Sequence, residues 1–167
     1  MLELFRVNGR INFTALVVSI FIALSVGLLS SYFVMSTFEE YAELIKPSFA
    51  PPASVFAPVW TVLYTLMGIA SYRIWMYGTE REDVRSALFY YGLQLFFNFL
   101  WTIIFFGLGL RGLAYLEIIL LLILIIVTTV RFYRIDEIAG YLFIPYVLWV
   151  AFASVVNLSI WLLNIDV

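Results

Sequence analysis

The stretch that decides the fold is Ile118-Ile-Leu-Leu-Leu-Ile-Leu-Ile-Ile-Val127, a run of ten aliphatic residues. A membrane-spanning β-strand would instead alternate apolar and polar residues over segments of about ten residues. This run does not alternate. It lies in an apolar segment, 113–130, that only Glu117 interrupts, and that segment is close to the ~20 residues that a helix needs to cross a ~30 Å hydrocarbon core. The run therefore indicates a membrane-spanning helix.

Four further segments of the chain carry no charge at all, namely 11–38, 47–72, 86–110 and 138–165. Each is longer than the ~20 residues of a membrane-spanning helix, and the first is too long for the core of a cleavable signal peptide. We therefore expect an all-α polytopic membrane protein, a bundle of five transmembrane helices, in which residues 1–167 form a single membrane domain. The expected helices cover 12–36, 54–77, 86–107, 111–133 and 138–163.

The composition agrees with a membrane protein and excludes several kinds of chemistry. Hydrophobic residues make up 65% of the chain, and the chain contains no histidine and no cysteine. Disulfides, thiol nucleophiles, the usual zinc sites and Ser-His-Asp or Cys-His catalytic groups are thereby excluded. We expect no metal site and no cofactor. The net charge of −2 gives no reason to expect nucleic acid as a partner, and the expected surroundings are a lipid bilayer.

The positive charges are unevenly distributed over the two ends of the expected bundle. Basic residues collect on the cytoplasmic side of membrane proteins. The end that holds the N-terminus would carry seven of the nine basic residues, and the opposite end only Lys46 and Arg111. We therefore expect a cytoplasmic N-terminus, with the opposite end of the bundle outside. The expected location is a prokaryotic cell membrane, as an integral protein. The seven residues are Arg6, Arg10, Arg73, Arg81, Arg85, Arg131 and Arg134.

The connection 37–53, which we call the lid loop, is longer than the other connections. It is acidic at first and then rich in proline, and it carries Tyr41 and Phe49. Long loops in compact domains are usually functional or disordered. Because the loop has apolar side chains to pack, we interpret it as an ordered lid over one end of the bundle.

Polar and aromatic residues recur at helical spacing at one depth of the expected bundle, on the side of the lid loop. Amides and carboxyls are costly in hydrocarbon and normally face the interior of a bundle. Asn98 must therefore point inward, and Trp101, three residues later, points inward with it. Gln94, one turn before Asn98, must point inward as well. The set expected at this depth, on four helices, is Trp60, Tyr64, Asn98, Trp101, Glu117, Ala153 and Asn157, with Trp149 near the middle of the membrane.

Two interpretations of this set remain open. A pocket lined by tryptophan, tyrosine and a few amides suits a flat aromatic or steroid-like ligand. Alternatively, the aromatic residues are ordinary packing and the amides of Asn98 and Asn157 are hydrogen-bonded between helices. Glu117 either reaches toward Arg111 or a neighbouring helix, or contributes to a ligand site.

Several spaced motifs resemble the tryptophan-rich sensory protein / translocator protein family, also called the peripheral benzodiazepine receptor family. The resemblance covers the chain from about residue 41 to residue 164, and the first expected helix matches only in hydrophobicity. The motifs, in order, are Lys46-Pro-Ser-Phe-Ala-Pro-Pro52, Val55-Phe-Ala-Pro-Val-Trp60-Thr-Val-Leu-Tyr64, Gln94-Leu-Phe-Phe-Asn98-Phe-Leu-Trp101 and Leu142-Phe-Ile-Pro145-Tyr-Val-Leu-Trp149-Val-Ala151.

The resemblance implies a five-helix bundle, often a homodimer, whose cavity is closed by the first long loop. It implies binding of porphyrins, notably protoporphyrin IX, and of other hydrophobic small molecules. Carried over by position, the ligand-binding residues are Tyr41, Trp60, Tyr64, Asn98, Trp101, Trp149 and Ala153. A polar mouth for the propionates would be supplied by Lys46, Arg111 and Glu117. Without histidine or cysteine the usual strong axial ligands of haem iron are missing, so metal-free protoporphyrin is the expected porphyrin.

The resulting expectation is a membrane receptor or carrier for porphyrins and similar flat hydrophobic ligands. An alternative is a membrane enzyme that degrades protoporphyrin IX in light, with Trp60 and Trp149 as redox partners, as the resemblance implies for some relatives. A third possibility is a scaffold that acts through a dimer interface, for which Ala23 and Gly27 provide small residues at i, i+4 spacing.

Overall fold

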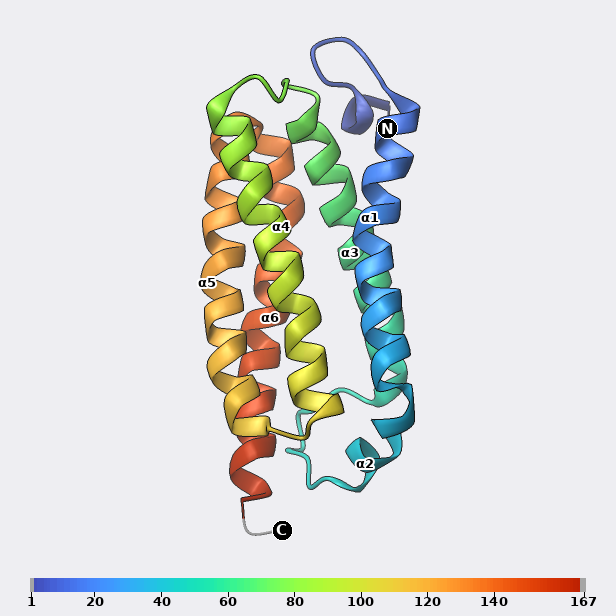
Figure 1. The fold of residues 1–167 in the computed structure, drawn as a ribbon, viewed down its shortest axis with the longest axis vertical. Helices are drawn as coiled ribbons and strands as arrows, with labels where there is room; N and C mark the ends of the chain where they lie inside the picture. The colour runs from blue at the N-terminus through green and yellow to red at the C-terminus, as the bar shows by residue number, and fades with distance from the viewer. Residues whose placement is uncertain (1, 166–167) are drawn as a thin grey trace.

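The computed structural model describes residues 2–165, and all of their side chains except those of Leu2, Ser36, Phe38, Glu39 and Glu40. The chain is a bundle of five long helices, each apolar enough to span a membrane (Figure 1). They are α1 (Phe13–Val34), α3 (Ala53–Trp75), α4 (Glu82–Thr102), α5 (Arg111–Ile135) and α6 (Glu137–Leu163). A π-helix, Ile103–Gly107, continues α4 to a span of 26 residues.

The helix boundaries have local causes. The Asn12 side chain accepts a hydrogen bond from the backbone N–H of Ala15 at 3.0 Å and thereby caps α1. The Asp136 side chain caps α6 in the same way, because it accepts a hydrogen bond from the backbone N–H of Ala139. α4 begins at Glu82, four residues before the expected start, because a charged first turn at the end of a bundle still reaches water.

The helices pack in two groups that face each other across the bundle. α1 packs along α3 (Figure 1), and α5 packs against both α4 and α6. α1 and α3 approach closely at Gly68, where a Cβ atom would lie 2.5 Å from Cα of Ile20. α5 and α6 approach in the same way at Gly140, where a Cβ atom would lie 2.7 Å from Cα of Tyr133. Helix packing in membranes relies on small residues of this kind.

The N-terminal residues fold against the end of the bundle opposite the lid loop. Arg73 and Asp136 form a buried ion pair there, with 2.7 Å between Nη2 and Oδ2. The same guanidinium donates to the backbone oxygen of Leu4 at 2.6 Å, so it ties the N-terminal segment to α3. Tyr72 adds a second tie, because its hydroxyl donates to the backbone oxygen of Phe5 and accepts from the N–H of Asn12.

The lid loop lies across the other end, next to the last turn of α6 (Figure 1). It contains a short helix, α2 (Phe38–Glu43), preceded by a 3-10 turn, Met35–Thr37. The Asn164 amide is bonded to both backbone groups of Ile45, at 3.0 Å to the N–H and 2.9 Å to the oxygen. Asn164 thereby fastens the lid loop to the end of α6.

Candidate ligand cavity beneath the lid loop

A cavity of about 450 Å³, which we call the main cavity, lies among α1, α3 and α4 beneath the lid loop. Pockets for small ligands commonly have volumes of ~300–1,000 Å³. Leu28, Ser31 and Thr61 line the cavity and are exposed, so it is not sealed on the side of α1 and α3. Its inner wall is formed by Gly27, Ser30, Phe56, Trp60, Tyr64, Trp101, Thr102 and Phe106, with Tyr41 from the lid loop.

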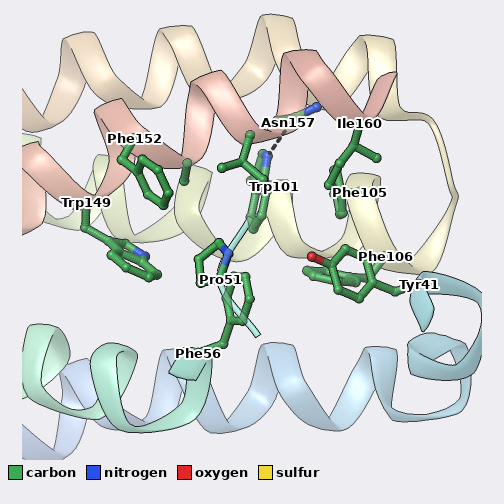
Figure 2. Close-up of a pocket in the computed structure, with 12 residues that line it drawn as sticks. Tyr41, Pro51, Phe56, Trp101, Phe105, Phe106, Trp149, Phe152, Asn157 and Ile160 are labelled. Atoms are coloured by element: carbon green, nitrogen blue, oxygen red, sulfur yellow. Dashed lines mark hydrogen bonds between the residues drawn. The ribbon is translucent and has the colours of Figure 1, made fainter. Parts of the chain in front are cut away.

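A second pocket, which we call the aromatic slot, lies on the other side of the same rings, against α6 (Figure 2). It holds only about 20 Å³ of free volume. Figure 2 shows Trp149 and Phe152 of α6 at one end of the slot, Ile160 toward the other, and Pro51 and Phe56 in the middle. The indole Nε1 of Trp149 is buried and has no hydrogen-bond partner among the described residues.

The main cavity and the aromatic slot share one wall of aromatic rings: Tyr41, Phe56, Trp101 and Phe106 line both. The ring centroids of Tyr41 and Phe106 are 5.2 Å apart, and the Trp101 ring stacks on Phe105 at 5.1 Å. The wall therefore consists of side chains from α2, α3, α4 and its π-helix. These rings separate the main cavity from the aromatic slot.

A chain of hydrogen bonds runs behind the main cavity and links three helices. The Tyr64 hydroxyl donates to Oδ1 of Asn98, and Nδ2 of Asn98 donates to the Tyr146 hydroxyl at 3.0 Å. Tyr146 in turn donates to Oε1 of Gln94 at 2.9 Å. The side-chain groups that link α3, α4 and α6 here satisfy one another, as buried polar groups must.

The second amide predicted to face inward serves a similar structural purpose. The indole N–H of Trp101 donates to Oδ1 of Asn157 at 3.1 Å, and Nδ2 of Asn157 donates to the backbone oxygen of Arg111 at 3.0 Å. Trp101 is therefore held in one orientation, with its ring in the shared wall. Because its N–H is already bonded, Trp101 offers a ligand its ring face alone.

The structure brings six of the seven predicted ligand-binding residues to the two pockets. Tyr41 and Trp101 line both, Trp60 and Tyr64 line the main cavity, and Trp149 and Ala153 line the aromatic slot. Asn98 lines neither pocket, because both ends of its amide are bonded to tyrosine hydroxyls. It supports the cavity wall from behind.

The three residues of the predicted polar mouth have different surroundings. Lys46 donates to the backbone oxygens of Ala42 and Leu44, and its Nζ lies 4.8 Å from the centre of the Tyr41 ring. Arg111 lines a small hollow that also contacts Tyr41, and its Nε is buried and unbonded within the described part of the chain. Both oxygens of Glu117 are likewise buried without a described partner, so its expected bond to Arg111 or to another helix is not seen.

Four phenylalanines that were not predicted from the sequence line the two pockets. They are Phe56, Phe105, Phe106 and Phe152. The chain has 16 phenylalanines, so the presence of a phenylalanine does not by itself mark a pocket position. A signal was available for Phe56, because it lies four residues before Trp60 on one helical face. Among the described residues no cluster of three acidic side chains could hold a metal ion.

This chain is similar in sequence to several known proteins. The sequence profile of the TspO/MBR family matches residues 18–162. The tryptophan-rich protein TspO of Archaeoglobus fulgidus is 40% identical over 92% of this chain and 99% of its own length. The protein of the same name from Chlorobaculum tepidum is 37% identical, over 86% and 95%. The translocator protein of Sus scrofa is also 37% identical, over 81% of each chain.

Proposed function

This chain belongs to the TspO/MBR family, and from that premise we propose that it is a membrane receptor or carrier for porphyrins. Its ligands would be protoporphyrin IX and similar flat hydrophobic molecules. The observation that carries the proposal is the main cavity of about 450 Å³, walled by Trp60, Tyr64 and Trp101 and covered by Tyr41 of the lid loop. Flat conjugated rings bind well between aromatic side chains, by offset stacking and by edge contacts.

The charges at the lid end support the same proposal. No acidic side chain among the described residues pairs with Lys46 or Arg111. Both are within reach of Tyr41, which covers the cavity, so two positive charges are available to the carboxylates of a porphyrin. Burial raises the pKa of the Tyr41 hydroxyl above its ordinary value, so Tyr41 stays neutral beside these cations and can donate a hydrogen bond.

The unbonded N–H of Trp149 in the aromatic slot supports ligand binding from the other side of the shared wall. A buried donor without an acceptor is costly, and a ligand oxygen or nitrogen that enters the slot would satisfy it. Entry would need the shared wall to open, since the free volume of the slot is about 20 Å³. We include in the proposal a cytoplasmic N-terminus, with the lid loop on the opposite side of the membrane, and a homodimeric assembly.

Titration with protoporphyrin IX, read by quenching of tryptophan fluorescence, tests the proposed function. We expect Trp60→Ala and Trp149→Ala to weaken binding by about tenfold each, since each removes stacking and buried contact area. Trp75→Ala is the matched control: Trp75 is an exposed tryptophan at the far end of α3, so its loss should leave the dissociation constant unchanged. Equal dissociation constants in all four proteins would contradict the proposed site.

A further inference from the structure

The series of hydrogen bonds behind the main cavity has a fixed donor-to-acceptor direction. A sulfur atom at its inner end determines that direction. Nε2 of Gln94 lies 3.9 Å from the sulfur of Met67, which has no hydrogen and can only accept. Oε1 of Gln94 must therefore face Tyr146, which donates to it and accepts from Nδ2 of Asn98. Oδ1 of Asn98 is then left to accept from Tyr64. Every donor along the chain points away from the cavity.

Tyr64 is the cavity end of this chain. A tyrosine hydroxyl has one hydrogen, and that of Tyr64 is used by Asn98. Its oxygen retains accepting capacity, and Tyr64 lines the main cavity. Gln94 and Asn98 are 0% and 1% exposed, so water does not compete for the amides and the direction is fixed by the protein. Toward a ligand, the Tyr64 hydroxyl is therefore an acceptor.

Three further hydroxyl groups that line the main cavity are oriented in the same sense. Ser30, Thr61 and Thr102 each donate to the backbone oxygen four residues earlier in their own helix. Their hydrogens are thus also used inside the protein, and their oxygens are what remains for a ligand. Ser30 and Thr102 line the inner wall together with Tyr64, so accepting oxygens lie on α1, α3 and α4 around one space.

We infer that the main cavity selects flat ligands that donate an N–H or O–H hydrogen bond to Tyr64. This goes beyond the proposed function, because the N–H groups of protoporphyrin IX lie at the centre of its ring; it rests on that function only in taking the cavity as a ligand site. A ligand with an oxygen acceptor at this position would meet the lone pairs of Tyr64, and neither group would have a hydrogen bond. The carboxylates of a porphyrin would be rejected here for the same reason, and would be directed to the lid end, where Lys46 and Arg111 lie.

Carbazole and dibenzofuran test this inference. They are fused tricyclic molecules of the same shape, and they differ in that carbazole carries an N–H donor where dibenzofuran has an oxygen acceptor. Both would be titrated into the full-length protein in lipid nanodiscs, with protein-free nanodiscs to correct for partition into lipid. We expect carbazole to bind about five- to tenfold more tightly to the wild type, the ratio that one hydrogen bond gives.

Three variants separate the role of Tyr64 from a general change in packing. Tyr64→Phe should bring the ratio of the two affinities close to one. Asn98→Leu should lower or invert the ratio, because it releases the Tyr64 hydrogen, which can then donate to dibenzofuran. Tyr91→Phe is the control, since the Tyr91 hydroxyl is also buried but has no partner among the described residues and lines no pocket described above. It should keep the wild-type ratio.

Equal binding of the two probes to the wild type would overturn the inference, as would a wild-type ratio that persists in Tyr64→Phe and Asn98→Leu, or binding of neither probe. These results are independent of the proposed function, which is measured with protoporphyrin IX. If the probes are discriminated as expected and protoporphyrin IX does not bind, the donor-selective cavity stands and the porphyrin is the wrong ligand. If protoporphyrin IX binds and the probes are not discriminated, the porphyrin site stands and the donor preference is wrong.

Discussion

Replacing Asp136 with alanine is expected to lower the free energy of unfolding by about 3–5 kcal/mol, the cost of leaving one charge of a buried pair unpaired. Asp136 accepts two hydrogen bonds from Arg73, at 3.1 and 2.7 Å, and one from the Tyr77 hydroxyl. It also caps α6. The loss would leave the guanidinium that holds the N-terminal segment on α3 buried without its counter-ion. Thermal unfolding in detergent, followed by circular dichroism, measures the effect.

The other arginine–aspartate pair near the same end of the bundle is the control for this prediction. Arg81 and Asp83 form a pair with 2.6 Å between Nη2 and Oδ2, but both side chains are exposed. Exposed ion pairs contribute little to stability. Asp83→Ala should therefore unfold at nearly the wild-type temperature. If the two variants were destabilised equally, the buried pair would not have the special role that its geometry indicates.

The same ion pair predicts a loss of stability in acid. Burial alone would raise the pKa of Asp136, but the hydrogen bonds from Arg73 and from the N–H of Ala139 outweigh it and hold the pKa below the ordinary value of 3.8. A carboxyl whose pKa is lower in the folded protein stabilises the fold above the ordinary pKa, and this contribution is lost as the pH falls through the folded-state value. Unfolding temperatures should thus drop below pH ~4, and Asp136→Asn should remove part of that drop.

Gly68→Ala is expected to destabilise the bundle by about 1–3 kcal/mol, since it overpacks the crossing of α1 and α3. The new Cβ atom would lie 2.5 Å from Cα of Ile20, and backbone cannot move aside as the tip of a side chain can. α1 would have to shift relative to α3. Because both helices line the main cavity, the same variant should also weaken binding of protoporphyrin IX. Unfolding in detergent and the fluorescence titration measure the two effects.

Gly92 provides the matched control within a membrane-spanning helix. It lies in α4, and a Cβ atom there would meet no atom within 4 Å. Gly92→Ala should leave stability unchanged or raise it slightly, since alanine favours helix over glycine. If Gly92→Ala were as destabilising as Gly68→Ala, the cause would be a general effect of losing glycine and not the helix crossing.

The five helices could be predicted from the sequence because charge is so costly in hydrocarbon that its absence marks each span. The position of Trp101 followed from its spacing to Asn98, which had to face inward, and that of Trp60 from its i, i+4 spacing to Tyr64 at the same depth. The spacing does not tell whether an inward polar residue faces a cavity or another polar residue. Asn98 was predicted to bind ligand by resemblance, with a hydrogen bond between helices as the alternative, and in the structure its amide is bonded to two tyrosine hydroxyls.

The contacts between distant parts of the chain could not be predicted in this way. Arg73 and Asp136 are 63 residues apart, and in the sequence Arg73 is only one of the positive charges that orient the bundle. The division into a main cavity and an aromatic slot was also not predicted, because the wall between them depends on the rotamers of Tyr41, Phe56 and Phe106. Spacing along a helix fixes the direction of a side chain but not the partners that it finds across the bundle.

The bond between Asn164 and Ile45 has a consequence for the order in which the protein matures. A ribosome makes Ile45 119 residues before it makes Asn164, so the lid loop leaves the ribosome long before its fastening exists. Until then the lid loop lacks its bonds to the end of α6, although Tyr41 can already pack against Phe106 of the π-helix. The bonds between the end of the last helix and the lid loop therefore form last, after all five helices have been made.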